Sequence, residues 1–248
     1  GDVSTAGRKV GGLVGNTRAS ITNASASGEV TTDGQEVGGL VGYLGAHSDE
    51  EVRNVTATGN VSAGSSNVGG LIGYVDQRSD SDEVTMSDAH ATGDVSTTYD
   101  AGGNAQVGGL VGRFHESRDL TNVSAIGDVT SATGNYVGGL VGRLQMENGN
   151  QVVSNAFATG AVTTTGDRVG GLMGDSNGII TDSYAHGAVS TTGQRVGGLV
   201  GSHQDGPIRN VTATGDVSTT GRKVGGLVCF SQTSVTHASA TREESSDA

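Results

Sequence analysis

The hexapeptide VGGLVG at positions 10–15 returns, almost unchanged, along the whole 248-residue chain. Copies of this block or of a close variant are 27 to 39 residues apart, and they begin at Val10, Val37, Val68, Val107, Val137, Val169, Val196 and Val224. A period of about 30 residues predicts a repeat fold in which each unit lies on the next. The chain is therefore expected to form a stacked ladder and not a globule.

A second block, of the form N/D-x-x-A-x-G-x-V, follows each of the first seven copies. It begins at Asn23, Asn54, Asp88, Asn122, Asn155, Asp182 and Asn210. In the last of these, small apolar residues alternate with Thr and Asp, which is the periodicity of a strand. VGGLVG does not alternate, so either both of its faces are buried or a glycine bulge bends it. We favour burial on both faces, with the glycines letting neighbouring backbone come close. Helical periodicity is not evident.

These blocks predict an all-β fold, a β-solenoid of about eight coils with roughly 30 residues and three short strands per coil. The unit is too short for a propeller blade. Residues 1–241 are expected to form one solenoid domain, and residues 242–248 a polar acidic tail. The glycines assigned a structural role in the repeat are Gly11, Gly12, Gly38, Gly39, Gly69, Gly70, Gly108, Gly109, Gly138, Gly139, Gly170, Gly171, Gly197, Gly198, Gly225 and Gly226.

No clear capping element is evident in the sequence. Residues 1–14 differ from residues 215–228 only by Ala6 in place of Thr220, so the chain starts and stops in mid-repeat. One hypothesis is that copies stack head to tail or belong to a longer array. The alternative is an arbitrary phase, with the tail REESSDA guarding the edge. The eighth copy has Cys229 where the others have Gly, which leaves its strand end uncertain.

The charge balance limits the partners. The chain has 26 acidic and 14 basic residues, a net charge of −12, and only two lysines, Lys9 and Lys223. Nucleic acid and anionic membranes are disfavoured, because phosphate binding needs clustered Lys and Arg. An acidic surface nearly free of Lys is typical of salt-loving archaea, although a merely acidic secreted protein is the alternative. No apolar run is long enough for a transmembrane helix, and one Cys excludes an internal disulfide framework.

The recurrent GGLVG and GGLIG, each followed by N-x-x-A-x-G-x-V, resemble the GLUG-motif repeats of large bacterial and archaeal surface proteins. Such repeats occur in adhesins and in the non-catalytic regions of some metallopeptidases. The resemblance covers nearly the whole chain and implies an extracellular or cell-surface protein, here of haloarchaeal type. It implies no particular activity.

A search for catalytic or metal-binding residues gives little. The six histidines (His47, His90, His115, His186, His203 and His237) lack metal-site spacing, and His115-Glu116 lacks the second His of HExxH, so most are expected at the surface. Asp2, Asp94, Asp128 and Asp216 share one repeat column, which Glu29, Asn60, Ala161 and Ala188 interrupt. We expect solvation or loose Ca²⁺ binding there, and no catalytic site, resident metal or cofactor.

Five sequons give a stronger functional hint. Asn23, Asn54, Asn60, Asn122 and Asn210 are N-glycosylation acceptors if the chain is exported, and four of them share one repeat position. The alternative is that Asn forms a turn or a ladder. Outward Thr pairs such as Thr56 and Thr58 suggest ice binding, but other coils place Phe157, Tyr184, His90 and Ile126 in those columns.

The sequence as a whole predicts a non-enzymatic structural or adhesive protein: a cell-surface stalk, an adhesin segment or a head-to-tail filament subunit. The connections that vary in length, around 74–87 and 96–106, would carry any recognition of a cell-surface or glycan partner. The alternatives are a receptor- or glycan-binding module such as a viral fibre and, less favoured, a polysaccharide-active solenoid enzyme.

Overall fold

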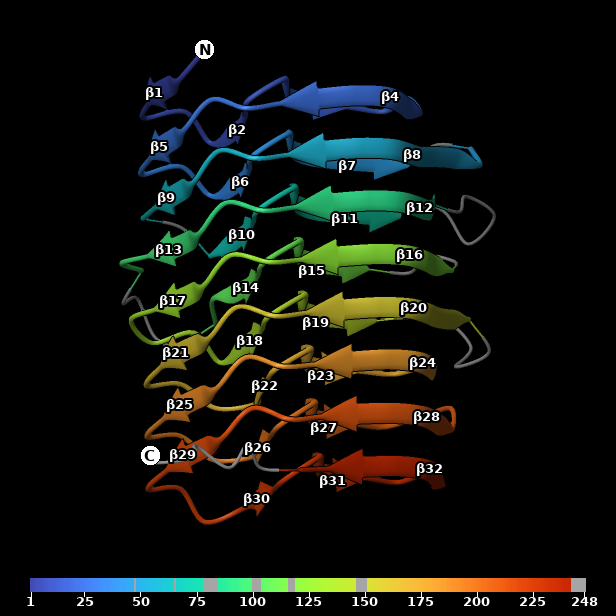
Figure 1. Cartoon of the computed structure of the whole chain (residues 1–248). Coiled ribbons are helices and arrows are strands. Elements are labelled where there is room, and N and C mark those ends of the chain that lie inside the picture. Colours follow the sequence, from blue (N-terminus) through green and yellow to red (C-terminus); the bar gives the residue numbers. More distant parts are fainter. Residues whose placement is uncertain are drawn as a thin grey trace, which may run out of the picture.

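The fold is a parallel β-solenoid in a computed structural model of the chain, drawn in Figure 1. The structure describes residues 1–46, 48–64, 66–77, 84–99, 104–115, 119–145 and 151–241. Its strands form four eight-stranded sheets, which we name A to D, and each coil gives one strand to each sheet. All strand pairs are parallel and join neighbouring coils. The expected β-solenoid of about eight coils is confirmed.

Sheets A and B consist of short strands. Sheet A contains β1 (Val3–Thr5), β5 (Val30–Thr32), β9 (Val61–Ala63), β13 (Val95–Thr97), β17 (Val129–Ser131), β21 (Val162–Thr164), β25 (Val189–Thr191) and β29 (Val217–Thr219). Sheet B contains β2 (Lys9–Gly11), β6 (Glu36–Gly38), β10 (Asn67–Gly69), β14 (Gln106–Gly108), β18 (Tyr136–Gly138), β22 (Val169–Gly170), β26 (Val196–Gly197) and β30 (Val224–Gly225).

Sheets C and D contain the longer strands. Sheet C contains β3 (Val14–Thr17), β7 (Val41–Ala46), β11 (Ile72–Gln77), β15 (Val111–His115), β19 (Val141–Gln145), β23 (Met173–Ser176), β27 (Val200–His203) and β31 (Val228–Ser231). Sheet D contains β4 (Ile21–Ala26), β8 (Glu50–Ala57), β12 (Val84–Ala91), β16 (Leu120–Ala125), β20 (Val152–Ala158), β24 (Ile179–Ala185), β28 (Ile208–Ala213) and β32 (Val235–Ala240).

The expectation of three strands per coil is wrong, because each coil has four. VGGLVG does not form one strand: it bends at its second glycine and leucine and divides between sheets B and C, as in β6 and β7. Sheet A is formed by three-residue segments that begin at the Val of each G-x-V, as in Val3–Thr5 and Val30–Thr32, and that resemble parts of a turn. Equivalent residues stack in register, as Val37, Val68, Val107 and Val137 do in sheet B.

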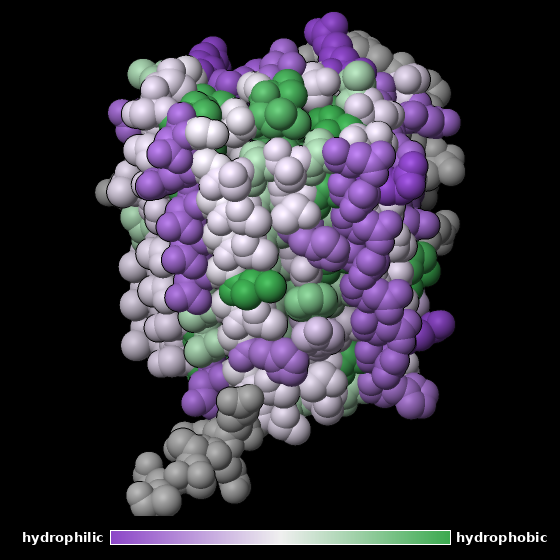
Figure 2. Space-filling view, turned by 45° about the horizontal axis from the view of Figure 1, so that its top comes forward, coloured by the Kyte–Doolittle hydropathy of each residue, from purple (hydrophilic) through white to green (hydrophobic). Residues whose placement is uncertain are grey.

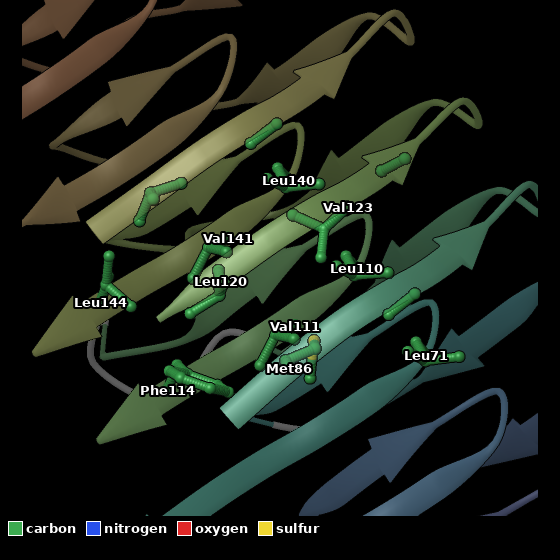
Figure 3. Close-up of a cluster of buried hydrophobic side chains, with 14 of the residues drawn as sticks. Leu71, Met86, Leu110, Val111, Phe114, Leu120, Val123, Leu140, Val141 and Leu144 are labelled. Atoms are coloured by element: carbon green, nitrogen blue, oxygen red, sulfur yellow. The ribbon is translucent and has the colours of Figure 1, made fainter. Parts of the chain in front are cut away.

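The bend separates two hydrophobic cores. The larger core lies between sheets C and D and includes Leu71, Met86, Leu110 and Phe114, all fully buried, as Figure 3 shows. The smaller core consists mainly of one valine per coil from sheet A and one from sheet B, such as Val30 and Val37. In the six copies between the first and the last, the block is buried on both sides, as expected, since its first Val enters the small core and its Leu the large one. In the two end copies Leu13 and Val224 are exposed.

The glycines lie where the two cores meet, and neighbouring backbone fills the space of their missing side chains. A Cβ on Gly39 would lie 2.2 Å from the Gly70 carbonyl oxygen of the next coil and 3.1 Å from the Ala57 Cβ of sheet D. The Ala of N-x-x-A-x-G-x-V therefore packs against the second Gly of VGGLVG. This contact explains why the two blocks recur together.

The last coil keeps the repeat geometry despite Cys229. Strand β31 forms and pairs with β27 through Val200 and Val228. The Cys229 thiol is partly exposed and donates a hydrogen bond to the Lys223 carbonyl oxygen at 3.2 Å, and burial raises its pKa. Across the described residues, no helix is long and apolar enough to span a membrane. The predicted tail, 242–248, lies outside the described residues.

Candidate functional site

The candidate site is the outer face of sheet D together with the turn that leads into sheet A. Two polar columns run along it, one of Asn and Asp within the strands and one, mostly acidic, at the turn. Figure 2 shows hydrophilic columns along the rod, with mostly paler residues of intermediate hydropathy between them. Four of the five sequons lie in the first column.

We call the first column the αL ladder, because every member has a positive φ of 49° to 54°: Asn23, Asn54, Asp88, Asn122, Asn155, Asp182, Asn210 and His237. The strand register skips each of them, pairing Thr22 with Arg53 and then Ala24 with Val55. Asn and Asp adopt this conformation more readily than other residues with side chains. Backbone geometry therefore accounts for Asn or Asp at the head of the second block.

Side chains of the αL ladder also bond to one another along the rod. Asn54 donates a hydrogen bond through Nδ2 to the Asn23 Oδ1 at 2.7 Å. Asn122 and Asn210 donate in the same way to Asp88 and Asp182. The hydrogen bonds from Asn210 and Thr181 lower the pKa of the Asp182 carboxyl. The ladder alternative raised by the sequence is thus present in the structure.

The structure brings four sequon asparagines into the αL ladder and places the fifth elsewhere. Asn23, Asn54, Asn122 and Asn210 are all exposed. Asn60 is also exposed, but it lies at the turn into sheet A, where its Oδ1 accepts a hydrogen bond from the Asp94 amide at 2.9 Å. Glycosylation at the five positions stays a prediction.

We call the column at this turn the carboxylate ladder. Asp2 accepts a hydrogen bond from the Glu29 amide at 3.0 Å, Asp94 from the Asp128 amide at 2.9 Å, and Asp128 from the Ala161 amide at 2.8 Å. Each side chain therefore reaches the backbone of the next coil and satisfies one amide there. These hydrogen bonds give the acidic column a structural role, which the sequence reading missed.

The histidines are mostly partly or fully exposed, with one exception among those described. His203 is fully buried, which corrects the surface position expected for most histidines in its case. Its Nε2 donates to the Gly206 carbonyl oxygen at 2.7 Å, and its Nδ1 lies 2.9 Å from the Ser176 hydroxyl. Burial lowers the pKa of His203, so the neutral ring is favoured. His47 lies outside the described residues.

Clusters of three or more His, Cys, Asp or Glu side chains with metal-site geometry do not occur in the described part of the chain. The Thr column of sheet D is irregular, as expected, because Thr56 stacks on His90, and Phe157 stacks on Tyr184 with ring centroids 5.0 Å apart. Glu116 and much of the two variable connections lie outside the described residues.

Sequence reasoning missed a more regular hydroxyl column on sheet A. Its members carry Ser or Thr in every coil: Ser4, Thr31, Ser62, Ser96, Thr130, Thr163, Ser190 and Ser218. All of them are exposed or half-exposed. The signal was present in the sequence, because the residue after each G-x-V is Ser or Thr in all eight copies.

The comparisons with known proteins agree with the repeat geometry. The family model of the GLUG motif matches residues 6–31, 33–62 and 192–218, each of which spans about one coil. These three segments therefore carry the GLUG motif. No solved structure matches it.

The chain is 62% identical over 159 residues to Halomucin of Haloquadratum walsbyi (strain DSM 16790 / HBSQ001). The matched region is 64% of this chain and 2% of Halomucin, so the chain spans a small fraction of that relative's length. The organism agrees with the expectation of a haloarchaeal source.

Proposed function

We propose that the chain is a segment of a non-enzymatic structural protein at the surface of a haloarchaeal cell. The observation that carries the proposal is the continuous ladder of four parallel sheets, with acidic, amide and hydroxyl columns turned to solvent. The similarity to Halomucin supports it, because that name denotes a mucin of a halophile. The GLUG repeats favour a structural role over a catalytic one.

The physical basis of this role is stiffness together with hydration. Each coil hydrogen-bonds to the next through four strands, so a local opening must break contacts on both sides. The net charge of −12 keeps the surface hydrated, and concentrated salt screens the repulsion between carboxylates. A rod of this kind suits a stalk or coat layer in brine.

Immunoelectron microscopy of native cells tests the location. Antibodies raised against the 248-residue chain should label the outside of intact, unpermeabilised cells. Labelling that requires permeabilisation would contradict the proposal.

N-glycosylation of the αL ladder is part of this proposal. The four sequon asparagines of the ladder are exposed on one side of the rod, so attached glycans would form a row. Glycopeptide mass spectrometry of native protein is the test, with Asn155 as an internal control, since it shares the ladder position but has no sequon. Unmodified asparagine at all four ladder sequons and at Asn60 would refute glycosylation while leaving the structural role in place.

An adhesin or receptor-binding role is the second candidate, and the connections between sheets C and D favour it. They vary from two residues, 177–178, to six, 78–83, and all leave the same side of the rod, because the strands of sheet C are stacked. Shortening 78–83 should abolish binding to cells or to a glycan array without changing the circular dichroism spectrum. Head-to-tail stacking into a filament stays a prediction, which electron microscopy of the purified chain tests.

A further inference from the structure

The basic residues of this acidic chain gather on one side of the rod. Of the eleven described Lys and Arg residues, eight lie on sheets B and C or within two residues before a strand of sheet B. They are Arg8, Lys9, Arg113, Arg143, Arg168, Arg195, Arg222 and Lys223. By the same definition, this side has only four described acidic residues: Glu36, Asp76, Asp167 and Asp175.

The other side of the rod has the opposite balance. Sheets A and D and their connections contain three described basic residues, Arg18, Arg53 and Arg209, and thirteen described acidic ones. Asp94 and Asp128 of the carboxylate ladder are among these acids, and both are exposed. Two sides of one rod thus carry complementary charge, which is the condition for one copy to dock on another.

Part of the basic side has its charge compensated within the coil stack. The Lys9 Nζ lies 3.7 Å from the Glu36 Oε2, and the Arg143 Nε lies 3.5 Å from the Asp175 Oδ2. The basic residues of coils six to eight, counted from the N-terminus, have no such ion pair among the described residues. Arg168 contacts only the ring of Tyr136, at 4.8 Å, among its described charged and aromatic contacts.

We call Arg168, Arg195, Arg222 and Lys223 the basic stripe. All four are exposed or half-exposed, and no carboxylate lies within ion-pair distance of them among the described residues. They stand just before the strands of sheet B in three successive coils, so their spacing along the axis is that of the coils.

We propose that the basic stripe docks against the carboxylate ladder of a second copy, so that rods associate side by side. The positions of both columns recur once per coil, about 4.8 Å along the axis. Asp94 and Asp128 lie in successive coils, so a contact made in one coil can recur in the next. With parallel axes and a shift of three coils, or about 14 Å, Arg195 would face Asp94 and Lys223 would face Asp128. An Arg guanidinium group can also donate two parallel hydrogen bonds to the two oxygens of a carboxylate.

The contact joins two different surfaces of the same chain, so each copy keeps one of each free for further copies. Such a heterologous contact does not close and builds layers or bundles. This lateral contact is independent of the proposed surface role and of head-to-tail stacking.

Sedimentation velocity of the whole chain at several concentrations tests the contact. We expect association that weakens between about 0.5 M and about 3 M NaCl, as screening increases. The double variant Arg195→Gln/Lys223→Gln should raise the dissociation constant about tenfold or more, because two exposed ion pairs, each weak alone, are lost together. The matched control Arg53→Gln/Arg209→Gln, on sheet D, should leave it unchanged.

A charge swap makes the test specific. Asp94→Arg/Asp128→Arg should abolish self-association but associate with an Arg195→Glu/Lys223→Glu variant when the two are mixed. Circular dichroism checks that all variants fold. A monomeric wild-type chain at every concentration, or equal weakening by the stripe variant and the control, would overturn the proposal. So would stripe-dependent binding of polygalacturonate by a chain that does not self-associate, since the partner would then be an anionic polysaccharide.

Discussion

At the scale of single residues, the glycines of VGGLVG are needed because the neighbouring backbone leaves no room for a side chain, and not because they adopt an unusual backbone conformation. Among the described glycines only Gly178 and Gly206 have a positive φ, and neither belongs to VGGLVG. The repeat glycines are therefore required because a side chain would collide with the next coil. In the αL ladder backbone conformation matters more, since its Asn and Asp residues are exposed or half-exposed but all have a positive φ.

Replacing a glycine between the two cores should therefore be costly. A Cβ on Gly70 would lie 2.1 Å from the Gly109 carbonyl oxygen, so Gly70→Ala should lower the free energy of unfolding by about 3 kcal/mol or more. Chemical denaturation in high salt measures this. The control is Gly7→Ala, where the nearest atom to a new Cβ is 3.6 Å away, and its effect should stay within about 0.5 kcal/mol. Equal effects would contradict the close approach of the coils.

The buried His203 predicts a pH dependence. Its pKa is lowered from 6.5 in the folded state, so the unfolded chain takes up a proton first as the pH falls. The contribution of neutral His203 to the free energy of unfolding is therefore intact above about pH 6.5 and is lost progressively as the pH falls below that value. His203→Gln should flatten the stability profile between about pH 6.5 and 5, measured by thermal unfolding. The exposed His237→Gln is the control, and an unchanged slope in His203→Gln would refute the buried neutral ring.

At the scale of the strands, the αL ladder combines a backbone requirement with a side-chain hydrogen bond. Every strand of sheet D contains one such residue, so the sheet has the same irregularity in each coil and remains in register. A single strand that lost the irregularity would shift its outward residues relative to both neighbours.

Two substitutions separate these contributions. Asn54→Gly keeps the positive φ accessible but removes the hydrogen bond to Asn23, and it should cost about 1 kcal/mol. Asn54→Ala also removes the hydrogen bond, and in addition it places in the left-handed region a residue that adopts it less readily than Asn or Gly, so it should cost about 1 kcal/mol more. Urea unfolding of both variants measures the difference. If Ala were tolerated as well as Gly, the left-handed conformation would not be what selects Asn here.

The sequence predicts much of this arrangement, and the failures have physical causes. Exact repetition predicts that Val37, Val68 and Val107 stack, because each coil must match the next. The sheet A strands were missed because three-residue segments such as Val162–Thr164 are too short for alternation to appear. The acidic column was predicted from the repeat, but its hydrogen bonds were missed, because they join residues far apart in the chain, such as Asp94 and Asp128, whose pairing depends on the register.

At the scale of the whole molecule, stability is built from neighbouring coils, and the surface is divided by charge. Each coil contacts mainly the coils before and after it, so the rod can lengthen without a new core. Acidic and hydroxyl columns face outward on sheets A and D, and the basic stripe lies on the other side. A stiff rod with two complementary sides can serve as a stalk and also as a unit of a layer.

The stacking itself is tested most directly by electron–electron distances between spin labels on the hydroxyl column of sheet A. In a Cys229→Ser background, Ser4→Cys is paired in turn with Thr163→Cys, Ser190→Cys and Ser218→Cys, which lie five, six and seven coils away. The solenoid predicts distances of about 24, 29 and 34 Å, rising by about 4.8 Å per coil. Distances that do not increase with coil number would contradict the solenoid.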